Sequence, residues 1–255
     1  MRTLLSIVIT FLFLASCHSS DKQQESKPEQ NGVQQLGHPF PHLFEITNSD
    51  DSLVHLYVDK GQADIFNEKL KDLDKSHPLY TDIDCESRMT LLATTPIDNS
   101  GKKYAIVYGY CPEPEFHFYA ANDLSKFYGA VAGLNMYITG NGNLYVSGHI
   151  NSNFDLKRKL KFEENNILEI RQPHYYVGLK TKTLKQINLY KTKNLKEVVA
   201  SLPENFEVEV LLAETSHQQE DYYLIKTEFG LIGWTKIRAG QYQSMDVEGI
   251  FWNGD

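Results

Sequence analysis

Apolar and polar residues alternate along much of the chain, which is the pattern of strands that bury one face. The clearest case spans 134–150, where two alternating runs flank the turn sequence Gly140-Asn141-Gly142-Asn143 and predict a β-hairpin. A second hairpin is predicted over 154–171, with its turn at Glu163-Glu164-Asn165-Asn166. Further strands are predicted over three short runs of β-branched or aromatic residues: 89–95, 103–110 and 115–120.

Two segments are predicted to be helical instead. Apolar residues recur every three or four positions within 63–75, which ends at Ser76-His77-Pro78, so an amphipathic helix is predicted there. A shorter helix is predicted over 124–132, after the cap-like Asn122. The fold class is therefore predicted to be mainly β. We expect an antiparallel meander or sandwich-like N-terminal body with one or two short helices, followed by a small β-barrel.

The first residues predict export. Arg2 precedes a predominantly apolar run from Leu4 to Leu14, which fits a secretory signal and is too short to span a bilayer. The run ends in Leu14-Ala15-Ser16-Cys17, which resembles the lipobox of bacterial lipoproteins. The resemblance implies that residues 1–16 are removed and that Cys17 is acylated as the mature N-terminus. The alternative is an ordinary signal peptide in which this cysteine is incidental.

The segment after the signal predicts a tether. Residues 18–32 contain no large apolar side chain, so they cannot offset the entropy of ordering, and 17–39 is expected to be flexible. It would hold a body of unknown function, 40–179, away from the membrane to which the lipid is attached. The expected location is the bacterial cell envelope, on the periplasmic or the cell-surface side.

Charge excludes one class of partner. The chain has 25 Lys and Arg against 33 Asp and Glu, a formal net charge of −8, so it lacks the cationic surface that nucleic-acid binding needs. Lysines gather within 180–196, and this shift in composition places a domain boundary near residue 180. No metal cluster, phosphate loop or complete catalytic set is recognised, so no metal, cofactor or catalytic residue is assigned.

Two cysteines remain after Cys17. In an oxidising compartment, Cys85 and Cys111 are expected to form a disulfide. The alternative is a nucleophilic cysteine with an imidazole base, for which His117 and His149 are the candidates.

The segment 180–240 differs in pattern from the preceding part of the chain. It contains five short strand-like runs, which are typical of a small barrel. Its sequence 202–211 and the stretch Gly230-Leu231-Ile232-Gly233-Trp234 resemble a bacterial SH3-like domain, although tyrosine stands where that family frequently has Arg and Trp. Such domains are commonly modules for cell-wall targeting or protein interaction. The candidate ligand-binding residues are aromatic, with half-buried barrel positions as the alternative: Tyr190, Tyr222, Tyr223 and Trp234. The apolar residues in 241–255 predict an extension that packs on the body.

These observations favour a non-catalytic envelope lipoprotein, whose partners are the membrane through the lipid anchor and peptidoglycan or an envelope protein through the SH3-like module. Two alternatives stay open. One is a cell-wall hydrolase of the peptidase or amidase class, and the other is an accessory subunit of a surface nutrient-uptake complex.

Overall fold

The computed structural model describes residues 39–110, 114–163, 165–214, 220–238 and 240–253. Within these ranges the chain forms strands β1 to β17 and two single turns of 3-10 helix, so the prediction of a mainly β fold is confirmed. In the same ranges, no helix has the length and the apolar character needed to cross a membrane.

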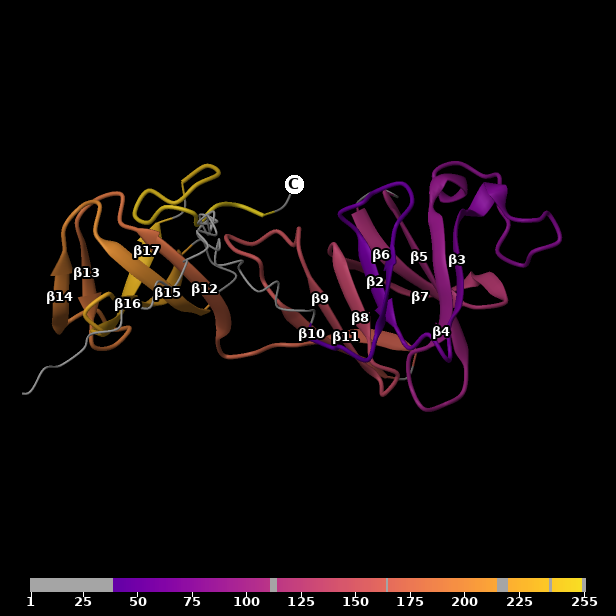
Figure 1. The fold of residues 1–255 in the computed structure, drawn as a ribbon, viewed down its shortest axis with the longest axis horizontal. Coiled ribbons are helices and arrows are strands. Elements are labelled where there is room, and N and C mark those ends of the chain that lie inside the picture. The colour runs from indigo at the N-terminus through magenta and orange to yellow at the C-terminus, as the bar shows by residue number, and fades with distance from the viewer. Residues whose placement is uncertain (1–38, 111–113, 164, 215–219, 239, 254–255) are drawn as a thin grey trace, which may run out of the picture. The chain divides into compact units, whose positions relative to one another are not determined.

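Sheet I combines strands that are far apart in the sequence (Figure 1). Its order is β1-β2-β8-β9-β10-β11, and neighbouring strands are antiparallel except for β2 and β8, which are parallel. The two predicted hairpins form β8-β9 and β10-β11. Gly140 and Gly142 in the first turn and Asn165 in the second adopt the positive φ that such turns need. The strands of sheet I are β1 (Phe44–Thr47), β2 (His55–Val58), β8 (Asn135–Ile138), β9 (Asn143–Ser147), β10 (Arg158–Glu163) and β11 (Asn166–Ile170).

Sheet II is an antiparallel meander in which strands that follow each other in sequence are neighbours. Three of its strands, β4, β5 and β6, fall on the strands expected from sequence, and β5 has the predicted bounds. The strands of sheet II are β3 (Asp64–Lys69), β4 (Thr90–Pro96), β5 (Lys103–Tyr110), β6 (Pro114–Ala120) and β7 (Asp123–Ala132).

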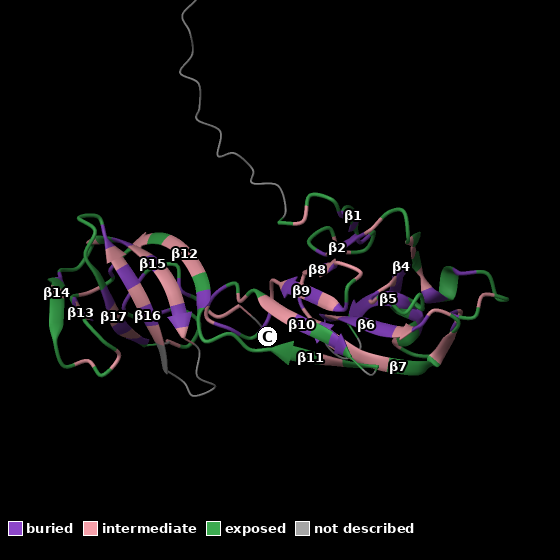
Figure 2. Cartoon of the chain, turned by 90° about the horizontal axis from the view of Figure 1, so that it is seen from below, coloured by how far each residue is buried: buried purple, intermediate pink, exposed green. Residues whose placement is uncertain are grey.

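Sheets I and II share one hydrophobic core, which appears as buried residues along their strands (Figure 2). Residues from most of these strands enter it, among them Leu56 and Val146 from sheet I and Tyr104 and Phe116 from sheet II. Burying a large apolar side chain contributes about 1.5–3 kcal/mol. The body is therefore a sandwich of two sheets, as the alternation predicts.

The second face of sheet II is covered by the long connection between β3 and β4. This connection contains the turns η1 (Leu70–Asp72) and η2 (Glu86–Arg88). Leu70, Leu79 and Met89 from the connection pack on Ala105 and Val107 of β5. Both faces of β5 are thus buried, which explains its almost continuous run of buried residues.

Sheet III contains the five strands expected in the C-terminal module and one strand more. The additional strand, β12, begins at Tyr175 and crosses the boundary expected at residue 180. The order is β12-β15-β16-β17-β13-β14, which leaves β12 and β14 at the two edges. The strands of sheet III are β12 (Tyr175–Lys182), β13 (Ile187–Tyr190), β14 (Val198–Leu202), β15 (Glu207–Glu214), β16 (Glu220–Thr227) and β17 (Ile232–Arg238).

A second hydrophobic core lies against the inner face of sheet III, which is an open sheet with two edges and does not form the closed barrel expected from sequence. Phe154, from the segment before β10, joins this core and lies 6.3 Å from the ring of Tyr223. The C-terminal segment 240–253 contributes Val247 and Ile250, and the backbone N–H of Asn253 donates to the carbonyl of Ser152 at 2.7 Å. The apolar side chains of the 240–253 segment therefore pack mainly in the core of sheet III.

Both helix predictions are wrong. The 63–75 segment forms β3 and η1, because a β-bulge between Ile65 and Glu68, with Asn67 at a φ of 59°, interrupts the strand alternation and imitates helical spacing. The 124–132 segment lies in β7, where pairing with β6 outweighs a weak local preference for helix.

Candidate functional site

Within the described part of the chain, no cysteine is available as a nucleophile. Cys85 is disulfide-bonded, and the other two cysteines, Cys17 and Cys111, both lie outside the described residues. Cys85 lines a cavity of about 410 Å³ together with Tyr110, the neighbour of Cys111 in sequence. This proximity supports the predicted pairing of Cys85 with Cys111, which stays a prediction. A disulfide-bonded Cys85 is not a nucleophile.

His117 is packed in the body instead of facing a cleft. Its side chain is 9% exposed, and its ring lies 6.3 Å from the ring of Tyr119 and 5.9 Å from that of Phe127. Burial lowers the pKa of His117 below its ordinary value of 6.5, so the imidazole is neutral near pH 7. His149 follows β9 with a φ of 46°, and thus lies just beyond the strand. Because Cys85 is disulfide-bonded, neither histidine can serve as the base of a Cys85 nucleophile.

The aromatic candidates of the C-terminal module divide between two faces of sheet III. Tyr223 is 1% exposed and belongs to the second core, so its ring is not available to a ligand. Tyr190, Tyr222 and Trp234 are partly exposed and alternate with buried neighbours along their strands. These three therefore project from the outer face of the sheet.

The outer face carries a continuous row of apolar and aromatic side chains. Residues opposite each other in an antiparallel ladder point to the same face. Following the register from β12 through β15, β16 and β17 to β13 gives the row, which we call the aromatic row: Tyr176, Leu212, Leu224, Trp234 and Tyr190. Tyr176 is 60% exposed and the other four are partly exposed. Figure 2 shows this alternation of buried and partly exposed positions along β15 and β16.

Charged side chains border Trp234 on this face. The Lys193 ammonium lies 5.5 Å from the centre of the indole ring and forms an ion pair with Glu214. The ring of His174 lies 5.8 Å from that of Trp234, and its Nδ1 is 3.7 Å from the same carboxylate. Tyr222 lies in the adjacent row, opposite Glu214. Trp234 thus combines a partly exposed ring with donors and an acceptor nearby.

Two glycines allow this arrangement. Gly230 has a φ of 97° in the turn before β17, a conformation that other residues rarely adopt. A Cβ at Gly233 would lie 2.7 Å from the Cβ of Leu189, so its absence lets β17 approach β13. The close approach brings Trp234 opposite Tyr190.

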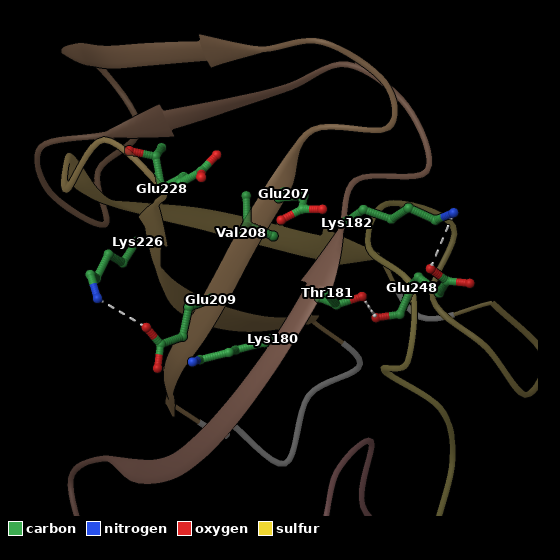
Figure 3. A pocket seen from close by; sticks show the side chains of 10 residues that line it. Lys180, Thr181, Lys182, Glu207, Val208, Glu209, Lys226, Glu228 and Glu248 are labelled. Atoms are coloured by element: carbon green, nitrogen blue, oxygen red, sulfur yellow. Dashed lines mark hydrogen bonds and ion pairs between the residues drawn. The ribbon is translucent and has the colours of Figure 1, made fainter. Parts of the chain in front are cut away.

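A groove of about 580 Å³ opens beside the aromatic row, across β12, β15 and β16 (Figure 3). Its volume is within the range of about 300–1,000 Å³ typical of small-molecule sites. We call it the charged groove because most of its lining is ionic, including Lys180, Lys182, Lys226, Glu207, Glu209 and Glu248. The Lys226 ammonium lies 3.0 Å from the Glu209 carboxylate, and Lys182 lies 3.7 Å from Glu248.

The charged groove was not found by sequence reasoning. The sequence does contain a pattern that could have indicated the groove. Charged residues stand two positions apart, as on one face of a strand, in three segments: 180–182, 207–209 and 226–228. Sequence alone does not show that these three pairs come from adjacent strands.

A second aromatic cluster was also missed. On the outer face of sheet I, the rings of Tyr57 and Tyr137 stack at 4.4 Å with an angle of 11° between their planes. Phe40 lies 5.3 Å from Tyr137 and 4.8 Å from Tyr145. The register places the three tyrosines opposite one another on β2, β8 and β9. Burial raises the pKa of Tyr137 to about 12.

The fold and this surface define a mainly β protein whose C-terminal sheet carries a ligand-sized groove beside an exposed aromatic row. Within the described residues, no three His, Cys, Asp or Glu side chains gather in an arrangement that could hold a metal ion. Comparison of the chain with protein families, with curated proteins and with solved structures finds no match.

Proposed function

We propose that this chain is a non-catalytic lipoprotein of the bacterial cell envelope, and that its C-terminal module binds peptidoglycan. The aromatic row is the observation that carries the proposal. Trp234 and Tyr190 lie opposite each other on the outer face of sheet III, with the Lys193–Glu214 ion pair beside the indole. Aromatic faces stack on the apolar faces of sugar rings, and adjacent charged groups supply hydrogen bonds to hydroxyl and amide groups.

Lipid attachment at Cys17 gives this binding a location. Each acyl methylene that enters the bilayer contributes about 0.8 kcal/mol, so two or more chains make the attachment stable. The tether expected over 17–39 would then allow the module to reach cell wall near the membrane. The resemblance to bacterial SH3-like domains supports the same role for sheet III.

Cosedimentation with purified peptidoglycan tests the module. The protein is produced as residues 18–255, so that no lipid contributes to the pellet. We expect Trp234→Ala and Tyr190→Ala each to weaken binding by about 2- to 10-fold, because each removes one aromatic contact of about 0.5–1.5 kcal/mol.

The matched control is Phe229→Ala. Phe229 is 88% exposed in the turn between β16 and β17, so this change removes a phenyl ring from the same module but outside the aromatic row. Peptidoglycan binding that is equal in the wild type and in the Trp234 and Tyr190 variants would contradict the proposal. Binding to an envelope protein, without binding to peptidoglycan, would also contradict it.

A separate experiment tests the anchor. The full chain and its Cys17→Ser variant are expressed in a bacterium and separated into membrane and soluble fractions. The unmodified chain is expected to fractionate with membranes and the variant to be released. Recovery of the variant in the membrane fraction at the level of the unmodified chain would contradict lipidation at Cys17.

A further inference from the structure

We propose that the charged groove binds a short zwitterionic peptide, with its carboxylate at Lys180 and its ammonium at Glu207 and Glu228. The inference rests on the proposed function in taking sheet III as the ligand-binding part. It adds a second site on that part and a different chemical class of ligand.

The groove has a fixed wall. Glu248 belongs to the C-terminal segment, and its backbone N–H donates to the carbonyl of Lys182 at 3.0 Å. The Thr181 hydroxyl donates to the carbonyl of Glu248 at 2.9 Å (Figure 3). The adjacent Val247 is fully buried in the second core, which prevents this segment from moving away independently. The groove is therefore formed before a ligand enters, and less binding energy is lost to ordering.

Ion pairing within the groove leaves charges of both signs available. Lys226 is paired with Glu209, and Lys182 is paired with Glu248. By contrast, no described side chain forms a hydrogen bond or ion pair with Lys180, Glu207 or Glu228. Lys180 lies opposite Glu209 in the ladder, and Glu228 follows β16. The available charges are one positive and two negative, and they come from three different segments.

This distribution selects a ligand with charges of both signs. A polyanion would be attracted to Lys180 but repelled by Glu207 and Glu228, and a polycation would meet the reverse arrangement. The side chain of Thr181 and the aliphatic stems of the lysines also line the groove, and these carbons are suited to contact with aliphatic groups, whereas Val208 and Thr227 are buried beneath it. A short peptide with free carboxylate and ammonium groups combines these features. The peptide portion of a cell wall is one source of such a ligand.

Isothermal titration of residues 18–255 with the tripeptide Ala-Glu-Lys, with free termini, tests the groove. The comparison probe is acetyl-Ala-Gln-norleucine-amide, which has similar length and no charge. Lys180→Met and Glu207→Gln are each expected to raise the Kd for the charged peptide by about 1.5- to 5-fold, as solvent-accessible ion pairs are weak. The double variant is expected to raise it by up to about 25-fold, if the two contacts act independently.

The control pair is Lys191→Met and Glu197→Gln. These residues pair with each other at 3.0 Å and do not line the groove, so their replacement changes the same charges elsewhere on the module. The proposal is overturned if the charged peptide does not bind, if the uncharged probe binds equally well, or if the double variant keeps the wild-type Kd. Peptidoglycan binding that still depends on Trp234 would then show that the proposed function survives without this inference. Peptide binding by the groove without Trp234-dependent binding to peptidoglycan would show that this inference holds and the proposed function fails.

Discussion

Replacing Gly233 by alanine is expected to separate β17 from β13. A Cβ at this position would lie 2.7 Å from the Cβ of Leu189, and 3.1 and 3.2 Å from the backbone oxygen and nitrogen of Tyr190. These atoms cannot rotate away, because they belong to the backbone or are fixed directly to it. The φ of Gly233 is not in the left-handed region, so crowding is the cause of the strain. Overpacking of this kind costs about 1–3 kcal/mol of the free energy of unfolding.

Tryptophan fluorescence during urea unfolding measures this effect selectively. The chain has two tryptophans, Trp234 in β17 and Trp252 in the C-terminal segment, so the signal reports on sheet III and its core. With a urea dependence of about 1–3 kcal/mol per molar, a loss of 2 kcal/mol lowers the midpoint by roughly 1 M. Gly61→Ala is the control, because its Cβ would meet only the side-chain oxygen of Asp59, at 3.3 Å. A Gly233→Ala midpoint equal to that of the wild type would refute the reasoning.

Three further predictions concern buried polar groups. Burial lowers the pKa of His117 below 6.5, so its contribution to the free energy of unfolding is fully present above pH 6.5 and is lost as the pH falls below that value. His117→Phe should therefore reduce this loss in urea titrations between pH 7 and 5. Burial raises the pKa of Tyr119 from 10.0 to about 12, so stability falls as the pH rises through 10, and Tyr119→Phe should reduce that loss in the same titration at alkaline pH. Asp246, 3% exposed, accepts a hydrogen bond from the backbone N–H of Arg238 at 2.6 Å and pairs with Lys185, so Asp246→Ala should cost about 1.5–3 kcal/mol by tryptophan fluorescence. A titration curve or midpoint that matches the wild type would contradict the corresponding prediction.

The local sequence pattern was sufficient to predict a strand where the strand and its partner are joined by a short turn. The 134–150 hairpin carries alternation on both strands and Gly and Asn between them, so its position follows from neighbouring residues. It was insufficient at 63–75, where one bulge changes the period, and at β12, where the lysine-rich boundary signal falls inside a strand. In both cases, pairing with a strand elsewhere in the sequence decides the structure.

The candidate sites depend even more on long-range register. Trp234 and Tyr190 are 44 positions apart in numbering, yet they lie opposite each other because β13 pairs with β17. Tyr223 and Tyr222 look equivalent in sequence, but the strand alternation buries the first and exposes the second to the outer face. Sequence thus identified the types of residue, and the sheet register determined which of them share a surface.

The composition of the second core limits how the module can be tested. A fragment that begins at residue 180 loses Tyr175 and most of β12, and therefore the edge strand that pairs with β15. A fragment that begins at β12 still lacks Phe154, which packs in the same core beside Tyr223. Ending a fragment at residue 240 removes Val247 and the wall of the charged groove. Loss of binding in such fragments would report unfolding instead of a missing contact, so point variants of the intact chain are the decisive test of both binding surfaces.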